Sequence, residues 1–383
     1  MQTLFLDYWP PLYAFLLSVG LIALLIKPAR ALGWVDLPST RKHHRQPVPL
    51  VGGAAMCIAY CLSMLSLPET PDSYQILLTS MVMLTLVGIY DDLRPTRPTI
   101  RFLFQIGAAL LMIIEGGISL ASLGHIFGID ELALDIFAIP CTVFCVVGVI
   151  NAFNMIDGLD GLAGGLGLIA AGWLVALSLT DPDAYPGAVS GLLLLIMVIA
   201  GFLVYNLRHP WRARASVFMG DAGSTMLGFA FCWFMVHLSQ DPRAVMTPIT
   251  AVWILAVPLM DTVTLMVSRM RASQSPFCPD RRHLHHLLLS YGFSDGQVTA
   301  ILLGTAFTSG AVGAGAYWLG IPEHQQFYAF MTLFLLYYGI TTRIWRKRAN
   351  AAAAVDPDRR QPPISKSDGS ANLLQAVPQQ NEP

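Results

Sequence analysis

The stretch from Asn151 to Gly161 reads Asn-Ala-Phe-Asn-Met-Ile-Asp-Gly-Leu-Asp-Gly, and it lies between two strongly apolar runs. Charged side chains are costly inside a membrane and usually have a function there. In a helix Asp157 and Asp160 would share one face, whereas Gly158 and Gly161 favour a bent junction between two helices. Both geometries present hard oxygen ligands together. Such oxygens suit Mg²⁺, which usually binds one or two carboxylates and the phosphates of a substrate.

The composition of the chain indicates a membrane protein. Of its 383 residues, 55% are hydrophobic and only 12% are charged, and the mean hydropathy is +0.57. A soluble domain carries roughly 25% charged residues, about twice this share. The formal net charge of −1 gives no reason to expect a nucleic-acid partner.

Apolar runs long enough to cross a bilayer, roughly 17 to 25 residues each, divide the chain. We expect an all-α polytopic protein with eleven transmembrane helices, near residues 10–26, 48–67, 74–90, 100–116, 136–153, 161–180, 187–206, 220–238, 247–268, 298–319 and 326–343. Residues 1–345 would then form one multi-pass membrane domain. Residues 346–383, which are rich in Ala, Pro, Gln and Ser, have the composition of a disordered tail.

The distribution of positive charge predicts the orientation. With eleven spans, all of the 23 Lys and Arg residues except Arg243 fall on one side of the membrane. Cytoplasmic loops carry the excess of Lys and Arg, so the N-terminus is expected in the periplasm and the C-terminus in the cytoplasm. This agreement also supports the number of spans, because one missed helix would move every later loop to the other side.

Five aspartates lie in or beside the cytoplasmic loops: Asp91, Asp92, Asp157, Asp160 and Asp221. The pair Asp91-Asp92 ends the third run, where the negative end of the helix dipole would favour Lys or Arg, and adjacent carboxylates repel unless a cation compensates. A helix cap is the structural alternative for the other three. Separate loops that carry acids to the same face favour a shared site.

The same loops carry cations and imidazoles. Lys42, His44 and Arg45 follow the first run and would anchor the protein at anionic lipid headgroups or contact phosphate oxygens; these two roles are compatible. After the ninth run come Arg282 and the sequence His283-Leu284-His285-His286. These histidines could bind zinc, but no carboxylate or cysteine completes an evident tetrahedral set, so diphosphate contact is favoured. Asp261, inside the ninth run, is either functional or paired with a polar neighbour.

Taken together, the loops resemble the polyprenyl-phosphate N-acetylhexosamine-1-phosphate transferases, multi-span enzymes that act at the inner face of the bacterial membrane. The likeness covers about residues 10–297 and rests on Asp91-Asp92 and residues 151–162, 218–228 and 275–287, with support from residues 36–53. The chain is most similar to the branch that uses N-acetylglucosamine and starts O-antigen and related polymers. The branch that makes the first lipid intermediate of peptidoglycan typically has three consecutive histidines, which Leu284 interrupts here.

The resemblance implies that undecaprenyl phosphate attacks the sugar-linked phosphorus of a UDP-N-acetylhexosamine and releases UMP. It implies Mg²⁺ as cofactor, with Mn²⁺ as a substitute, and a homodimer in the inner membrane with the site on the cytoplasmic face. The family's first motif often contains a third acid, but position 95 is Pro here, so that role is not carried over. The implied catalytic residues are Asp91, Asp92 and Asp157, the implied metal ligands Asp221 and Asp92, and the implied nucleotide-sugar contacts Asn154, Asp160, Asn206, His283, His285 and His286.

Two other functions stay open from the residues alone. A transferase of phospho-N-acetylmuramoyl-pentapeptide belongs to the same superfamily. A transporter or flippase would also have many spans and an acid such as Asp261 inside the membrane. Transport is disfavoured because the sequence shows no internal repeat and its acids gather in cytoplasmic loops.

Overall fold

The computed structural model describes residues 2–37, 46–67, 72–185, 187–209, 212, 214–240, 243–275 and 282–355. Two compact units, residues 1–338 and 339–383, make up the chain, and all helices and strands belong to the first except residues 339–355 of the last helix. In chain order the elements are α1 (Gln2–Ala31), β1 (Val35–Asp36), β2 (Val48–Pro49), α2 (Gly52–Leu65), α3 (Asp72–Leu93), α4 (Pro98–Ile114), η1 (Asp135–Phe137), α5 (Ala138–Ile156), α6 (Leu162–Ser178), α7 (Ala188–Asn206), α8 (Gly220–His237), α9 (Pro248–Ile254), α10 (Ala256–Arg271), α11 (Leu284–Ser290), α12 (Asp295–Trp318) and α13 (Glu323–Val355).

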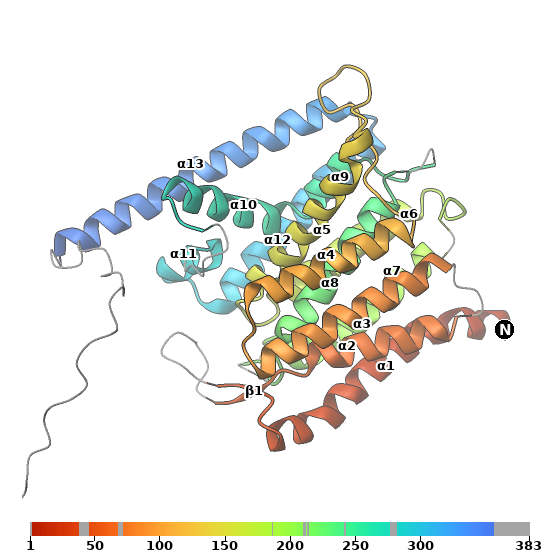
Figure 1. Ribbon diagram of the computed structural model, residues 1–383. Helices are drawn as coiled ribbons and strands as arrows, with labels where there is room; N and C mark the ends of the chain where they lie inside the picture. The colour runs from red at the N-terminus through yellow and green to blue at the C-terminus, as the bar shows by residue number, and fades with distance from the viewer. Residues whose placement is uncertain are drawn as a thin grey trace, which may run out of the picture. The chain divides into compact units, whose positions relative to one another are not determined.

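Each of the eleven predicted apolar runs coincides with a helix or a helix pair (Figure 1). Most bounds agree to within a few residues, but α1 begins well before the first run and α13 ends well after the last. In the described part of the chain, α1, α3, α5, α7, α12 and α13 are long and apolar enough to cross a membrane, and α9 with α10 adds a seventh span if this bent pair counts as one. The helices α2, α4 and α6 are apolar but shorter. The protein is therefore an all-α multi-pass membrane protein, while the number eleven and the orientation stay predictions.

The predicted ninth run, residues 247–268, differs from a straight span. It is broken at Leu255, and α9 and α10 meet at 86°. Figure 1 shows α10 leaving the direction of α9. Pro258 lacks the backbone N–H that would bond the carbonyl of Ile254, and a proline in this position favours a break in the preceding turn. The bend carries α10 toward the short helix α11, which holds two of the predicted histidines.

Close helix packing brings the predicted acids together. The buried helix α8 packs against α2, α3 and α5. A Cβ atom at Gly88 of α3 would lie 2.3 Å from the Cα atom of Ala222, and one at Gly53 of α2 would lie 2.2 Å from the backbone nitrogen of Gly223. Small residues at such contacts let helix backbones approach closely. As a result the end of α3 lies beside the start of α8.

Backbone hydrogen bonds fix the segment before α8. The strands β1 and β2 pair antiparallel, with Asp36 opposite Val48. Phe218 donates its N–H to the carbonyl of Pro49 at 2.9 Å, and its own carbonyl accepts from the N–H of Gly52 at 3.0 Å. The two strands, the start of α2 and the start of α8 therefore form one connected unit.

Candidate active site

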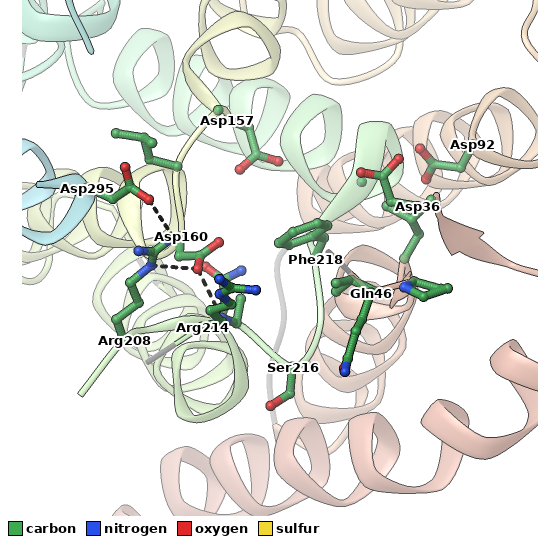
Figure 2. A pocket seen from close by; sticks show the side chains of 18 of the residues that line it. Asp36, Gln46, Asp92, Asp157, Asp160, Arg208, Arg214, Ser216, Phe218 and Asp295 are labelled. Carbon is green, nitrogen blue, oxygen red and sulfur yellow. Dashed lines mark hydrogen bonds and ion pairs between the residues drawn. The ribbon is translucent and has the colours of Figure 1, made fainter. Parts of the chain in front are cut away.

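A cavity of about 830 Å³ lies where the ends of these helices meet. Figure 2 shows Asp36 and Asp92 on one side of it and Asp157 and Asp160 on the other, with Phe218 between them. The predicted site residues that line the cavity are Asp92, Asn154, Asp157, Asp160, Asn206, Asp221, His285 and His286. They come from segments far apart in the sequence, so the predicted convergence of separate loops is confirmed for these residues.

Asp91, Asp92 and Asp221 form the part of the site that we call the acidic end. Asp91 accepts hydrogen bonds on Oδ1 from the backbone N–H of Thr96 at 2.7 Å and from its hydroxyl group. Asp221 accepts on Oδ1 from Nδ2 of Asn154 at 2.8 Å. The remaining oxygens, Oδ2 of Asp91 and Oδ2 of Asp221, lie 2.9 Å and 2.7 Å from the same atom, Nη1 of Arg101. One guanidinium group thus bridges the two carboxylates.

Only one of the two carboxylate oxygens of Asp92 has a hydrogen-bond partner. Its Oδ1 accepts from the backbone N–H of Asp221 at 3.0 Å, whereas its buried Oδ2 has no hydrogen-bond partner. Gly220, at a φ of +70°, lies against this oxygen, and a Cβ atom there would come within 2.4 Å of it. Only glycine adopts this conformation and leaves this space readily. A buried acceptor without a partner calls for an explanation such as an ion.

The acidic end fits a divalent cation by its chemistry. Three carboxylates meet there, and among the residues that the structure describes one cationic side chain, Arg101, pairs with two of them. Hard oxygen atoms of this kind are the ligands that Mg²⁺ prefers. No three His, Cys, Asp or Glu side chains in the described part of the chain are already grouped as a ligand set, and the guanidinium of Arg101 occupies the space between two of these carboxylates. Asp92 and Asp221 are the residues that would hold the ion.

Neither Asp157, which follows the last residue of α5, nor Asp221 caps the N-terminus of a helix. The residues at the cap positions of α6 and α8 are Gly161 and Met219, and neither helix has a side-chain cap. The predicted bent junction is confirmed, because α5 ends at Ile156 and Gly161 adopts a φ of +79° before α6 begins. At this junction burial raises the pKa of Asp157 to about 7, with further contributions from the negative charges of Asp221 and Asp160.

The opposite wall, which we call the braced end, consists of Asp160, Arg208, Asp295 and Asn206. Asp160 Oδ2 accepts from Nε of Arg208 at 2.7 Å and from the backbone N–H of Ala215 at 3.0 Å. Arg208 also pairs through Nη2 with Asp295 at 2.8 Å. Dashed lines in Figure 2 mark these contacts.

Asn206 is buried within the braced end. Its Oδ1 accepts from the backbone N–H of Gly161 at 2.8 Å, and its Nδ2 donates to the carbonyl of Val217 at 2.9 Å. The two ends of this amide therefore join the α5–α6 junction to the segment before α8. Its predicted contact with the nucleotide sugar stays a prediction. In the structure its hydrogen bonds hold two backbone segments of the cavity wall together.

The histidines are held in place by Asp261. This buried carboxylate lies 2.8 Å from Nδ1 of His283 through Oδ2, and its Oδ1 accepts from the backbone N–H of Leu284 at 2.9 Å and from the hydroxyl of Tyr337 at 3.1 Å. Of the two alternatives for this acid, pairing with polar neighbours is the one seen. The ring of His285 packs beside that of His283 at 5.4 Å and faces Gly158.

Some predicted residues lie behind the cavity or outside the described residues. Asp91, His283 and Arg282 are described but do not line the cavity. Asp91 is linked through Arg101 to Asp221, and His283 packs beside His285. Lys42, His44 and Arg45 lie outside the described residues, as does most of the predicted tail, residues 356–383.

Sequence reasoning missed Arg101, Arg208 and Asp295. Arg101 carried a signal, because a cation in the first turn of a helix opposes the helix dipole. The sequence around Asp295 gave no signal of a site. This residue follows Ser294, and its position in the first turn of α12 beside a capping box is an ordinary one for an acid. Arg208 was counted only among the cytoplasmic cations that set the orientation.

Comparisons with known proteins agree with this geometry. The family profile described as glycosyl transferase family 4 matches residues 74–239. The undecaprenyl-phosphate alpha-N-acetylglucosaminyl 1-phosphate transferase of Yersinia pestis is 36% identical over 340 residues, which are 88% of this chain and 91% of the relative. Proteins of the same name from Escherichia coli K12 and Haemophilus influenzae are each 35% identical, over 84% and 86% of this chain and 87% and 93% of their own lengths. The chain belongs to glycosyl transferase family 4.

Proposed function

We propose that this protein transfers N-acetylglucosamine 1-phosphate from UDP-N-acetylglucosamine to undecaprenyl phosphate, forming undecaprenyl-diphosphate-N-acetylglucosamine and UMP. The names of the relatives support this reaction. The observation that carries it is the cavity, which carboxylates from α3, the α5–α6 junction and α8 line together with cationic and imidazole side chains. Moving a phosphoryl group between two anionic partners requires both kinds of group, because negative charge must be bound and neutralised.

The cavity offers cationic and imidazole groups to a nucleotide sugar. Arg30, Arg212 and Arg214 line it together with His285 and His286, and guanidinium groups match phosphate oxygens geometrically. These side chains give a bound diphosphate its donors, while a cation at the acidic end would reduce the repulsion between its carboxylates and a phosphate.

The proposed reaction is a direct displacement. An oxygen of the lipid phosphate forms a bond to the sugar-linked phosphorus, and the bond from that phosphorus to the bridging oxygen of UMP breaks. The lipid phosphate is already a competent nucleophile, so no protein nucleophile is required. Positioning of the two partners and stabilisation of charge then provide the rate enhancement.

Each residue has a proposed part in that step. Asp92 and Asp221 would hold Mg²⁺, which when bound supplies positive charge to the phosphate oxygens. Asn154 orients Asp221 through its amide. Asp91, held by Thr96, keeps the lipid-phosphate side of the site in place. His285 and His286 are placed to donate to the diphosphate, and Asp261 fixes their loop through His283.

The location follows from the charge pattern of the sequence. We place the cavity at the cytoplasmic face of the bacterial inner membrane, where a UDP-sugar and the phosphate end of the lipid both have access. The product would be the first lipid-linked sugar of O-antigen or another envelope polysaccharide, as in the family branch that the sequence resembles.

Purified protein in detergent tests the proposed function. With UDP-N-acetylglucosamine, undecaprenyl phosphate and Mg²⁺ we expect equal amounts of UMP and of the lipid-diphosphate sugar, measured by chromatography and mass spectrometry. Omission of the lipid should stop UMP release, and chelation should stop both until Mg²⁺ is restored. Folded protein that releases no UMP, or that binds the lipid without cleaving the nucleotide sugar, would support a transporter instead.

A further inference from the structure

We propose that Arg101 is an exchangeable counter-ion of the acidic end: its guanidinium binds the Asp221 oxygen that the divalent cation takes, and it leaves when the cation binds. This inference rests on the metal site of the proposed function. It adds a residue that competes with the metal for the same oxygen atoms.

Accounting for each carboxylate oxygen leads to this assignment. Oδ1 of Asp91, Asp92 and Asp221 each accept a hydrogen bond from Thr96, the backbone of Asp221 and Asn154, respectively. The three Oδ2 atoms remain. Nη1 of Arg101 binds two of them, at 2.9 Å and 2.7 Å, and the third, Oδ2 of Asp92, is buried without a partner. A divalent cation therefore finds one available oxygen while Arg101 stays and three once it has moved.

Arg101 can give up this position only by moving. A guanidinium group does not lose its proton in a protein, so its positive charge remains and repels a second cation at the same oxygens. Its side chain is 33% exposed and stands on the first turn of α4. Arginine side chains have several rotatable bonds, and a partly exposed one can swing away without unfolding its helix.

The displaced guanidinium has a use. Its planar donors match phosphate oxygens in a two-pronged manner, and the lipid phosphate must arrive beside the metal. The exchange then couples two binding events: the metal binds the carboxylates while a phosphate binds the guanidinium of Arg101. Metal binding without phosphate should be weak in the natural protein, because Arg101 has no anion to move to.

Binding of Mn²⁺ to the substrate-free protein, followed by electron paramagnetic resonance, tests the proposal without any turnover. Arg101→Gln should bind Mn²⁺ roughly tenfold more tightly than the natural protein, within the usual range of coupling between sites. Arg101→Lys, which keeps the charge but loses the planar fork, should fall between them. Arg97→Gln, an exposed arginine near the same helix start, is the control and should leave the affinity unchanged.

A second arm adds inorganic phosphate at a fixed Mn²⁺ concentration. Phosphate should tighten Mn²⁺ binding more in the natural protein than in Arg101→Gln, because only the former has a guanidinium to receive the anion. If phosphate tightens binding equally in both proteins, the coupling is overturned. Thermal melting with and without Mn²⁺ shows whether each variant is folded, and folded Arg101→Gln should gain more stability from the metal than the natural protein does.

Asp221→Asn separates failure of this inference from failure of the proposed function. If Asp221→Asn abolishes Mn²⁺ binding and Arg101→Gln leaves it unchanged or weakens it, the metal site stands and the role of Arg101 is overturned. If Mn²⁺ binds equally well to Asp221→Asn, the metal lies elsewhere and the proposed function loses its metal site. Tighter binding to Arg101→Gln that Asp221→Asn eliminates supports both.

Discussion

The acidic end and the braced end of the cavity satisfy their carboxylates in different ways. At the braced end, Asp160 and Asp295 share the guanidinium of Arg208, and Asp160 also has a backbone donor. At the acidic end, Asp91 and Asp221 share the guanidinium of Arg101, and Oδ2 of Asp92 has no partner. Buried polar groups are normally paired. The braced end is therefore complete as it stands, whereas the acidic end leaves an oxygen of Asp92 unpaired, which favours the proposed cation there.

The largest loss of transfer activity is expected when a charge is removed at the acidic end. Asp221→Asn keeps the shape of the side chain but removes the negative charge that would hold the metal. We expect transfer to fall by about 10³-fold or more, in line with the loss of a group that stabilises transition-state charge. The rate of UMP release at saturating substrates measures this effect. Activity within tenfold of the natural protein, in membrane-inserted Asp221→Asn, would contradict the role of Asp221.

The next largest effect is expected at the contact between α3 and α8, which brings the residues of the acidic end together. Gly88→Val would place a branched side chain against the backbone of Ala222 and push α3 away from α8. Overpacking of this kind costs about 1–3 kcal/mol, and the separation of Asp92 from Asp221 should also lower activity. Gly107→Val in α4, where a Cβ atom meets nothing within 4 Å, is the matched control. Equal melting temperatures for the two variants would argue against this packing.

Asp157 lies between the two ends, and its raised pKa gives a test by pH. A carboxyl group whose pKa is raised to about 7 on folding stabilises the protein fully below its unfolded value near 4. This stability is lost as pH rises through 7, by at most about 1.4 kcal/mol per pH unit. Melting between pH 5 and pH 8 should show this decline, and Asp157→Asn should make it shallower.

Mg²⁺ sharpens the same measurement. If the ion binds at Asp221, it cancels part of the charge that raises the pKa of Asp157, so the decline should become shallower when Mg²⁺ is present. A decline that Mg²⁺ leaves unchanged in the natural protein would place the ion away from Asp221.

The smallest effects are expected at the braced end. Asp295→Asn removes one of the two carboxylates that hold Arg208, and partly exposed ion pairs contribute only about 0.2–1 kcal/mol. Activity should fall less than tenfold, mainly through a higher KM, because Arg208 still holds Asp160. Asp181→Asn, which breaks the exposed pair with Arg243, is the control. A loss at Asp295 as large as that at Asp221 would remove the distinction between the two ends.

Sequence patterns predicted the parts of this site that depend on local chemistry. The polar stretch 151–161 predicted a bent junction with two acids, and Asp221 was expected at a helix start; both are confirmed. Apolar runs predicted the helices because burial and membrane insertion follow side-chain hydropathy. The break at Leu255 was missed, since Pro258 lies in a run that is apolar enough to suggest one span and the direction of α10 depends on its tertiary neighbours.

The partners of the acids could not be predicted in the same way. Arg101 and Asp221 are 120 positions apart, and no local rule indicates that one cation bridges two separate carboxylates. Asn206 was expected to contact the nucleotide sugar, but its amide is occupied by two backbone groups. Such pairings depend on where the helices meet. The close contacts at Gly88 and Gly53 set those positions, and the sequence alone does not show which helices these glycines contact.

The central claim is that the acidic end holds the catalytic cation, and the anomalous scattering of Mn²⁺ bound to the protein tests it most directly. A crystal grown with Mn²⁺ and a phosphate-bearing ligand should give an anomalous peak within coordination distance of Asp92 and Asp221, with the guanidinium of Arg101 moved away from both carboxylates. A peak at His285 and His286 instead, or no peak while Arg101 still bridges Asp91 and Asp221, would contradict the claim.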